Sequence, residues 1–287
     1  MAAFPASPDE GAAGVLISDA CEMVCRSDAG CVRTLNEDVA TVRPDIGLLL
    51  VADGMGGHNA GELAARIAAE AVEEKLRHGL VRRPVDAAAA GELLRQAVVR
   101  AGRRIRRKAA AERHQSGMGA TLACVLLYDD HACVVHVGDT RVYRLRDRRL
   151  QLLTRDHSPN QQAHDAGLIS AEQLAASHNR HLVTQALGLG GEGVVRSQLV
   201  PVVPGDIFLV CSDGLNDMVD GQDIELVLDS FAEKLPMAAD QLVMIARDCG
   251  GHDNVSVALA RVDMSFAQGG RSLLARLLAW LPLRGDR

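Results

Sequence analysis

The stretch Gly47–Gly54, with the sequence GLLLVADG, carries the clearest structural signal in the chain. It is a short apolar run bounded by turn-forming residues, which is typical of a strand buried on both faces. The strand is expected to end at Asp53 and Gly54. An ionisable carboxyl group therefore stands directly at the end of a buried strand.

The same arrangement recurs further along the chain. Three more apolar runs carry an aspartate at one end: ACVVHVGD (132–139), IFLVCSDG (207–214) and HDNVSVALA (252–260). Asp-Gly is also a common turn dipeptide, so a single occurrence has a turn-only explanation. Together, the four runs predict that strand ends gather carboxylates at one rim of the fold.

Clustered carboxylates require a counter-charge. Ionised carboxylates packed together repel one another at a cost of several kcal/mol, or take up protons, unless a cation lies between them. Oxygen-only ligands suit Mg²⁺ or Mn²⁺, whereas zinc prefers nitrogen and sulfur. Two such ions about 3.5–4 Å apart lower the pKa of a bridging water and aim it in line at a phosphate. The acids therefore predict hydrolysis of a phosphate ester without a covalent phosphoenzyme.

Two long amphipathic helices are expected after the first strand. Apolar residues recur at helical spacing over residues 59–78, where Asn59 is a candidate cap, and again from about 87 to 113. Residues 119–153 form short β-rich runs joined by tight polar turns, which predicts an antiparallel meander.

The second half of the chain mixes strands and helices irregularly. Residues 155–181 are polar, with a short helical stretch, and are too long for a hairpin connection, so we expect a flap over the site. Two strands follow Val194, then short helices at about 222–229 and 236–249, and a last strand after Asp253. This order favours an α+β fold over a doubly wound sheet.

Composition narrows the class of protein. The 287 residues, 48% of them hydrophobic, can bury a sizeable core, and we expect one catalytic domain with short extensions. An aromatic content of 2% and a net charge of −6 argue against nucleic-acid binding. Seven cysteines without CxxC spacing favour core thiols in a reducing cytosol over a disulfide frame or a zinc site. The N-terminus has no signal-peptide pattern and no apolar run is long enough to span a membrane, so the expected location is cytoplasmic.

An ordered set of six motifs resembles the bacterial branch of the metal-dependent type 2C protein serine/threonine phosphatases, the PPM family. The motifs are NED (36–38), VADGMGGHNAGE (51–62), GMGATL (117–122), HVGDTR (136–141), LVCSDGLND (209–217) and GGHDNVSV (250–257). The resemblance covers about Cys21 to Asp263. It implies a four-layer α-β-β-α sandwich with two central antiparallel sheets and a metal cleft at one end.

The resemblance also implies an activity and a set of metal ligands. The expected reaction is hydrolysis of phosphoserine and phosphothreonine in proteins by a water that bridges two Mn²⁺ or Mg²⁺ ions. Asp53 would bridge both ions, the Gly54 carbonyl and Glu37 would serve one, and Asp213 and Asp253 would serve the other. Asp38 is a further candidate beside Glu37, and Asp139 matches the acid that binds a third ion, with Ser177 of the flap as a possible helper.

Three other residues have candidate roles. Arg33 matches the family's phosphate-holding arginine, although a plain surface arginine is the alternative. Asn254 would orient Asp253 or a bound water, or simply form a turn. The well-known animal members have a histidine directly after the DG pair as proposed general acid, whereas Met55 stands there in this chain. The nearby His58 would then donate the leaving-group proton, or it would cap the following helix.

The domain plan has three parts: a flexible leader over 1–18, the phosphatase domain over 19–263, and a C-terminal amphipathic helical extension over 264–287. Leucines at helical spacing, with Trp280, make the last segment amphipathic. It would rest on its own domain, dock a partner or lie on a membrane surface. Expected partners are phosphorylated proteins, including a serine/threonine kinase and its targets.

Two other functions remain open at this point. A catalytically silent relative would use the fold as a binding or sensing module, but the four main metal acids are present. A phosphatase of small metabolites would use the same chemistry in a different groove, and the flap favours a protein substrate over that alternative.

Overall fold

The computed structural model describes residues 17–56, 60–82, 85–175, 177, 182–190 and 194–267. Its centre is a pair of five-stranded sheets in which every neighbouring pair of strands is antiparallel. The first sheet has the order β2 (Asp38–Arg43), β3 (Leu48–Met55), β4 (Gly119–Tyr128), β5 (His131–Val137) and β8 (Ser197–Pro201). The second has the order β1 (Cys21–Asp28), β10 (Val255–Val262), β9 (Ile207–Cys211), β6 (Arg141–Arg146) and β7 (Arg149–Leu152).

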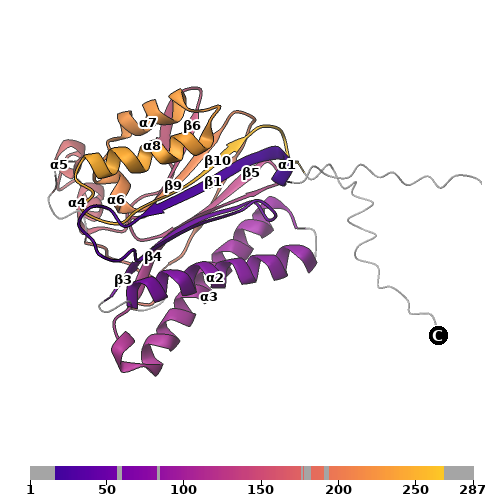
Figure 1. Ribbon diagram of the computed structural model, residues 1–287. Coiled ribbons are helices and arrows are strands. Elements are labelled where there is room, and N and C mark those ends of the chain that lie inside the picture. The colour runs from indigo at the N-terminus through magenta and orange to yellow at the C-terminus, as the bar shows by residue number, and fades with distance from the viewer. Residues whose placement is uncertain are drawn as a thin grey trace, which may run out of the picture.

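Helix pairs cover the outer faces of the two sheets, which completes the expected α-β-β-α sandwich (Figure 1). The helices α2 (Ala60–Arg82) and α3 (Ala87–Ala111) pack on the first sheet, and α7 (Gly221–Ser230) and α8 (Leu235–Asp248) pack on the second. The remaining helices are short: α1 (Ile17–Ala20), the 3₁₀ turn η1 (Arg113–Gln115), α4 (Pro159–Asp165), α5 (Ala171–Ala175) and α6 (Asp213–Asn216). Within the described ranges, no helix is long and apolar enough to cross a membrane.

Alternating side chains divide the interior into three apolar layers. In β3, Leu48 and Leu50 face α2 and α3, while Leu49 and Val51 face the other sheet. Along β9, Phe208 and Val210 point between the sheets, and their neighbours point to α7 and α8. Since a strand with both faces covered needs apolar residues at every position, the continuous run in GLLLVA follows from its central place.

The predicted meander over 119–153 is wrong in one respect. Its four strands form two hairpins in different sheets, because β5 pairs with β4 and β8, whereas β6 pairs with β7 and β9. The chain changes sheet between β5 and β6, over residues 138–140. Strand patterns in a sequence report which faces are buried but not which strands pair, so the crossing left no signal.

Gly138 makes the crossing possible. Its φ is +105°, and a Cβ atom there would lie 2.5 Å from Cβ of Thr121. The hydroxyls of Thr121 and Thr140 hydrogen bond at 2.5 Å beside it. On the flap side, the Gly138 N–H donates to Nδ1 of His157 (3.1 Å), and the His157 N–H donates to the Gly138 carbonyl (2.9 Å). The crossing is therefore fixed from both sides.

The boundaries of several elements differ from the sequence prediction. Helix α2 continues to Arg82, past the expected end at His78, and the strands β1 and β2 and the short helix α6 carried no clear pattern. Phe266 is buried between the sheets and its N–H donates to Oδ1 of Asp130 (2.7 Å). The packed domain therefore reaches past the predicted boundary at Asp263. The proposed helix over 271–283 lies outside the described residues.

The crossing yields a stability prediction. We expect Gly138→Ala to lower the free energy of unfolding by about 3 kcal/mol, because it adds both left-handed backbone strain and a steric clash. Gly205→Ala is the matched control, since Gly205 has a φ of +94° and nothing within 4 Å of an added Cβ. That variant should lose only the backbone part, about 1 kcal/mol. Urea denaturation measures both, and equal losses would contradict the steric argument.

Candidate metal centre

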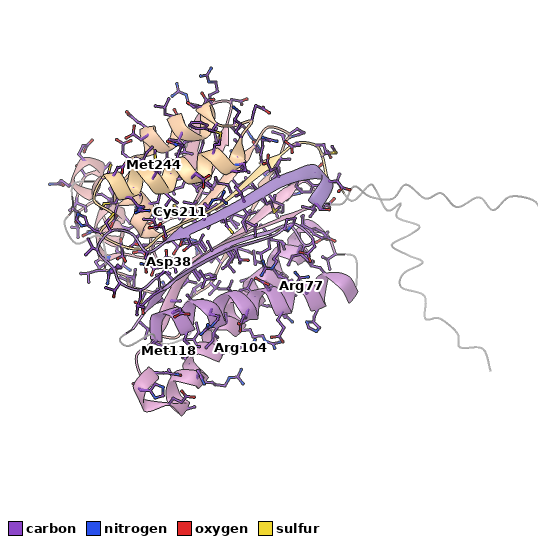
Figure 2. All side chains as sticks on the ribbon, in the orientation of Figure 1. Asp38, Arg77, Arg104, Met118, Cys211 and Met244 are labelled. Atoms are coloured by element: carbon purple, nitrogen blue, oxygen red, sulfur yellow. The ribbon has the colours of Figure 1, made fainter. Side chains whose placement is uncertain are left out.

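The antiparallel order of the sheets brings the predicted acids to one end of the sandwich. The connections β1–β2, β5–β6 and β9–α6, the end of β3 and the start of β10 all lie at this end. Asp38 and Asp53 stand opposite each other on β2 and β3. Asp213 lies two residues after the end of β9 and begins α6, and Asp253 lies two residues before the start of β10. Figure 2 shows Asp38 in the sheet layers, between the helices that carry Arg77 and Arg104 and the helix that carries Met244.

Asp53 lies at the electrostatic centre of the group. Its pKa is raised well above the ordinary value, first by removal from water and then by four neighbouring negative charges. Those neighbours are Asp38, Asp213, Asp139 and Asp253. Because each of them acts on Asp53, the structure brings these five predicted metal acids together.

Asp38, opposite Asp53 on β2, is buried. The Ser212 hydroxyl donates to its Oδ2 atom at 2.8 Å, and the same hydroxyl accepts the N–H of Ser256 at 3.0 Å. Burial raises the pKa of Asp38 to about 7, although the hydrogen bonds from Ser212 and Ser256 oppose the rise. Ser212 therefore fixes the orientation of Asp38, a role that the sequence analysis missed.

Asp139 enters the group from the sheet crossing. It is only 5% exposed, and burial together with the charge of Asp213 raises its pKa to about 7. Among the described residues, no group donates a hydrogen bond to its buried Oδ1 atom. A buried carboxylate oxygen without a donor is costly unless a cation or a proton satisfies it.

Glu37 and Gly54 depend on a close approach of backbone segments. The Gly54 N–H donates to the Glu37 carbonyl at 3.2 Å. A Cβ on Gly54 would lie 2.0 Å from the Gly61 carbonyl oxygen, and one on Gly61 would lie 2.5 Å from Oε1 of Glu37. Glycine at both positions lets the first turn of α2 pack against Glu37. The sequence offered this signal in NAGE (59–62), but it was not interpreted.

Arg33 faces the acids from the exposed β1–β2 loop. Its Nη2 atom donates to Oδ2 of Asp253 at 2.8 Å, and its side chain is 54% exposed. That hydrogen bond, followed by the charges of Asp253, Glu37 and Asp53, raises the pKa of Arg33. A guanidinium group at the exposed edge of the predicted metal-binding acids is well placed to bind an anion.

Asn254 is buried, and its side chain hydrogen bonds to the β1–β2 loop. Its Oδ1 atom accepts the Glu37 N–H (2.8 Å), and its Nδ2 atom donates to the carbonyls of Ala29 (3.0 Å) and Leu35 (2.9 Å). Its backbone N–H donates to Oδ1 of Asp253 at 2.8 Å. The expected contact with Asp253 thus comes from the backbone.

The flap lies beside the acids, as predicted. A pocket of about 340 Å³ separates α4 and α5 from the metal end, with Asn160, Gln161 and Leu174 on the flap side and Asp139 and Asp213 on the other. The Ser177 N–H donates to the Leu174 carbonyl at the end of α5, so its role beside Asp139 stays a prediction. His58 lies outside the described residues.

The donor set fits hydrated divalent cations. Within the described ranges, no three His, Cys, Asp or Glu side chains converge on one point as a closed site. Mutual repulsion separates free carboxylates, and Mg²⁺ or Mn²⁺ bound by few protein oxygens retains several waters. The unsatisfied Oδ1 atom of Asp139 and the raised pKa of Asp53 are the features that such cations would relieve.

Comparisons with known proteins identify relatives of this chain. The family described as "Protein phosphatase 2C" matches residues 33–244. The serine/threonine phosphatase stp of Listeria monocytogenes is 32% identical over 249 residues, which cover 86% of this chain and 97% of that protein. The serine/threonine protein phosphatase PstP of Mycobacterium tuberculosis is 36% identical over 249 residues, which cover 85% of this chain and 45% of that protein.

A solved structure shows the same fold. The crystal structure of the catalytic domain of PstP in complex with two manganese ions superposes with a TM-score of 0.74 at 34% sequence identity. The match covers 85% of this chain and 99% of that one.

The raised pKa values predict how the metal-free protein responds to pH. Asp38 and Asp139 have pKa values raised from 3.8 to about 7, so the folded state binds more protons than the unfolded state between these values. Their contribution to stability is present below the ordinary pKa and is lost as the pH rises towards 7. We therefore expect the Tm of chelator-treated protein to fall as the pH is raised through this window.

Calorimetry on the parent and on Asp38→Asn/Asp139→Asn isolates this effect, because other titrating groups are common to both. The fall in Tm should be smaller in the double variant. Mn²⁺ added at neutral pH should restore the Tm of the parent, since an ion that binds only the folded state stabilises it. Identical pH profiles for the two proteins would contradict the assignment.

Proposed function

Because the chain belongs to the protein phosphatase 2C family, and is a metal-dependent protein serine/threonine phosphatase that uses Mn²⁺ or Mg²⁺, we propose that its acidic end holds two such ions. Asp53 would bridge them, with Glu37 and the Gly54 carbonyl on one ion and Asp213 and Asp253 on the other. The observation that carries this assignment is the clustering of acids at Asp53. Asp38 stands opposite it on β2, and the charges of Asp38, Asp213, Asp139 and Asp253 all raise its pKa. Asp38 would act on an ion indirectly, through a neighbouring acid or a metal-bound water.

When bound, two such ions lower the pKa of the attacking water and stabilise charge on the phosphate. The chain's own residues prepare the site for this chemistry. Ser212 orients Asp38, and the two glycines 54 and 61 bring Glu37 against α2. Asp139, with its unsatisfied oxygen, would hold a third ion beside Asp213.

Arg33 is the proposed phosphate ligand. Its planar guanidinium group can grip two phosphate oxygens at once, and more than half of its side chain is open to solvent. The donor that now bonds to Asp253 would then turn to the substrate. His58 is the candidate proton donor to the leaving group.

The substrates are phosphorylated proteins, and we propose that a serine/threonine kinase and its targets are among them. The flap supports a protein substrate over a small metabolite, because it forms one wall of a pocket that continues from Asp139 and Asp213. The cytosol is the proposed location, since all seven cysteines lie in the described residues and are free thiols.

Removal of one metal acid tests the two-metal assignment. We expect Asp53→Asn and Asp213→Asn each to lower hydrolysis of p-nitrophenyl phosphate on the order of 100-fold or more, because each loses a direct ligand. Activity of the parent should require Mn²⁺ or Mg²⁺ and vanish with chelator. Asp240→Asn is the matched control: Asp240 lies on α8 and forms an exposed ion pair with Arg26 of β1, so this variant should retain activity. A folded parent that is inert with every metal would instead favour the silent binding module.

The C-terminal stretch 271–283 is the proposed docking element, because its leucines recur at helical spacing. Deletion of residues 268–287 should leave turnover of p-nitrophenyl phosphate unchanged, because the segment follows the last packed residue described, Phe266. The same deletion should weaken sedimentation with anionic vesicles or co-purification with a kinase partner. Loss of folding on deletion, measured by circular dichroism, would contradict a separate docking role.

A further inference from the structure

We propose that Asn254 is a positioning residue that holds the β1–β2 loop, residues 29–37, in register with Asp253 and so fixes where Arg33 meets the phosphate. The inference rests on the proposed role of Arg33 and concerns a residue that contacts neither the substrate nor an ion. Its basis is a set of hydrogen bonds from one buried side chain to both ends of the loop.

The loop has little apolar burial to hold it. Val32 and Leu35 are 61% and 52% exposed, and Arg33 between them is largely open to solvent. A segment with few buried apolar contacts is kept in place mainly by its polar contacts. Outside Asn254, the loop backbone is tied by the Cys31 N–H to the Gly251 carbonyl (2.8 Å) and by the Gly30 N–H to Oδ1 of Asp28 (2.8 Å). Both of these bonds lie in its first half. The end of the loop is held by the Gly54 N–H on the Glu37 carbonyl (3.2 Å) and by Nδ2 of Asn36 on Oγ of Ser27 (2.8 Å). The Asn254 amide reaches the stretch between them, beside Arg33, through the Leu35 carbonyl.

The Asn254 amide spans the whole loop. Its two donated bonds reach Ala29 at the beginning and Leu35 near the end, and its oxygen accepts the N–H of Glu37. Both donors and one of the two acceptor positions of the primary amide group are therefore used. Aspartate lacks the donors and alanine lacks all three contacts, so no common substitution reproduces the bonds.

The backbone of Asn254 is itself held by close packing. It is 5% exposed, and a Cβ on Gly214 would lie 2.0 Å from its carbonyl oxygen, so α6 packs directly against its backbone. The preceding residue, Asp253, receives the Asn254 N–H on Oδ1 and Arg33 on Oδ2. The same short segment therefore fixes both the metal acid and the loop that carries the arginine opposite it.

This arrangement predicts a particular kinetic signature. Loss of the amide should displace Arg33 and weaken the grip on phosphate, which raises KM for p-nitrophenyl phosphate by about tenfold. In an Arg33→Ala background the same loss should have little further effect on KM, because residues that act through one another are not additive. A purely structural role of Asn254 would instead give independent effects that multiply.

The experiment is a double-mutant cycle of Arg33→Ala and Asn254→Ala, with Asn254→Asp as a second variant that keeps an acceptor oxygen but loses both donors. Asp206→Asn is the matched control. It is an isosteric amide–carboxylate exchange at a fully buried residue whose bonds to Arg146 and Val203 lie at the other end of β9. It should lower stability without a change in KM. Independent KM effects of the Arg33 and Asn254 changes would overturn the proposal.

Hydrogen–deuterium exchange on chelator-treated protein gives a readout without activity. In both Asn254 variants, peptides covering residues 29–37 should exchange about tenfold faster or more, because the loop opens locally. Unchanged protection there would overturn the proposal. If Arg33→Ala alone leaves KM unchanged, the phosphate role of Arg33 fails, and the exchange rates still decide whether Asn254 holds the loop.

Discussion

Repulsion among carboxylates gathered at one end of the sandwich is the constraint on which the rest of the site depends. Asp38, Asp53 and Asp139 lie where water is largely excluded, and their pKa values rise because negative charges crowd together as they lose hydration. A fold gains nothing in stability from such a cluster. Divalent cations of the kind that this family uses would neutralise it. The serines and glycines around it keep acids in place that would otherwise move apart.

The double-sheet architecture solves this problem by dividing the acids. Asp38 and Asp53 come from the first sheet, Asp213 and Asp253 from the second, and Asp139 from the segment that passes between them. Each sheet is held by its own ladder of hydrogen bonds and by apolar layers on both faces. The repulsive end is thus a small part of a structure whose remaining contacts are favourable, which is how strained functional sites persist.

The sequence predicted those parts of the structure that depend on local pattern. GLLLVADG identified a strand with two buried faces, and the helical periods located α2, α3, α7 and α8. The strand-end aspartates predicted a cluster of acids at one end of the fold, and these acids do act on one another there. Strand pairing was not predictable, because the runs at 131–137 and 141–146 look alike although they enter different sheets. Ser212, Gly61 and the side-chain partners of Asn254 were missed for the same reason: their contacts are distant in sequence, and no local period reports them.

The apolar layer between the sheets has a consequence for the chemistry at its end. Packed sheets lie about 10 Å apart, a separation set by the side chains that fill the gap. Here these include Leu49 and Val51 facing Phe208 and Val210. Since the acids lie at the ends of both sheets, the apolar side chains between the sheets set the width of the proposed metal cleft. Ions bound across the cleft would in turn link one sheet to the other, so a change in the thickness of the apolar layer would be expected to change the ion affinity as well.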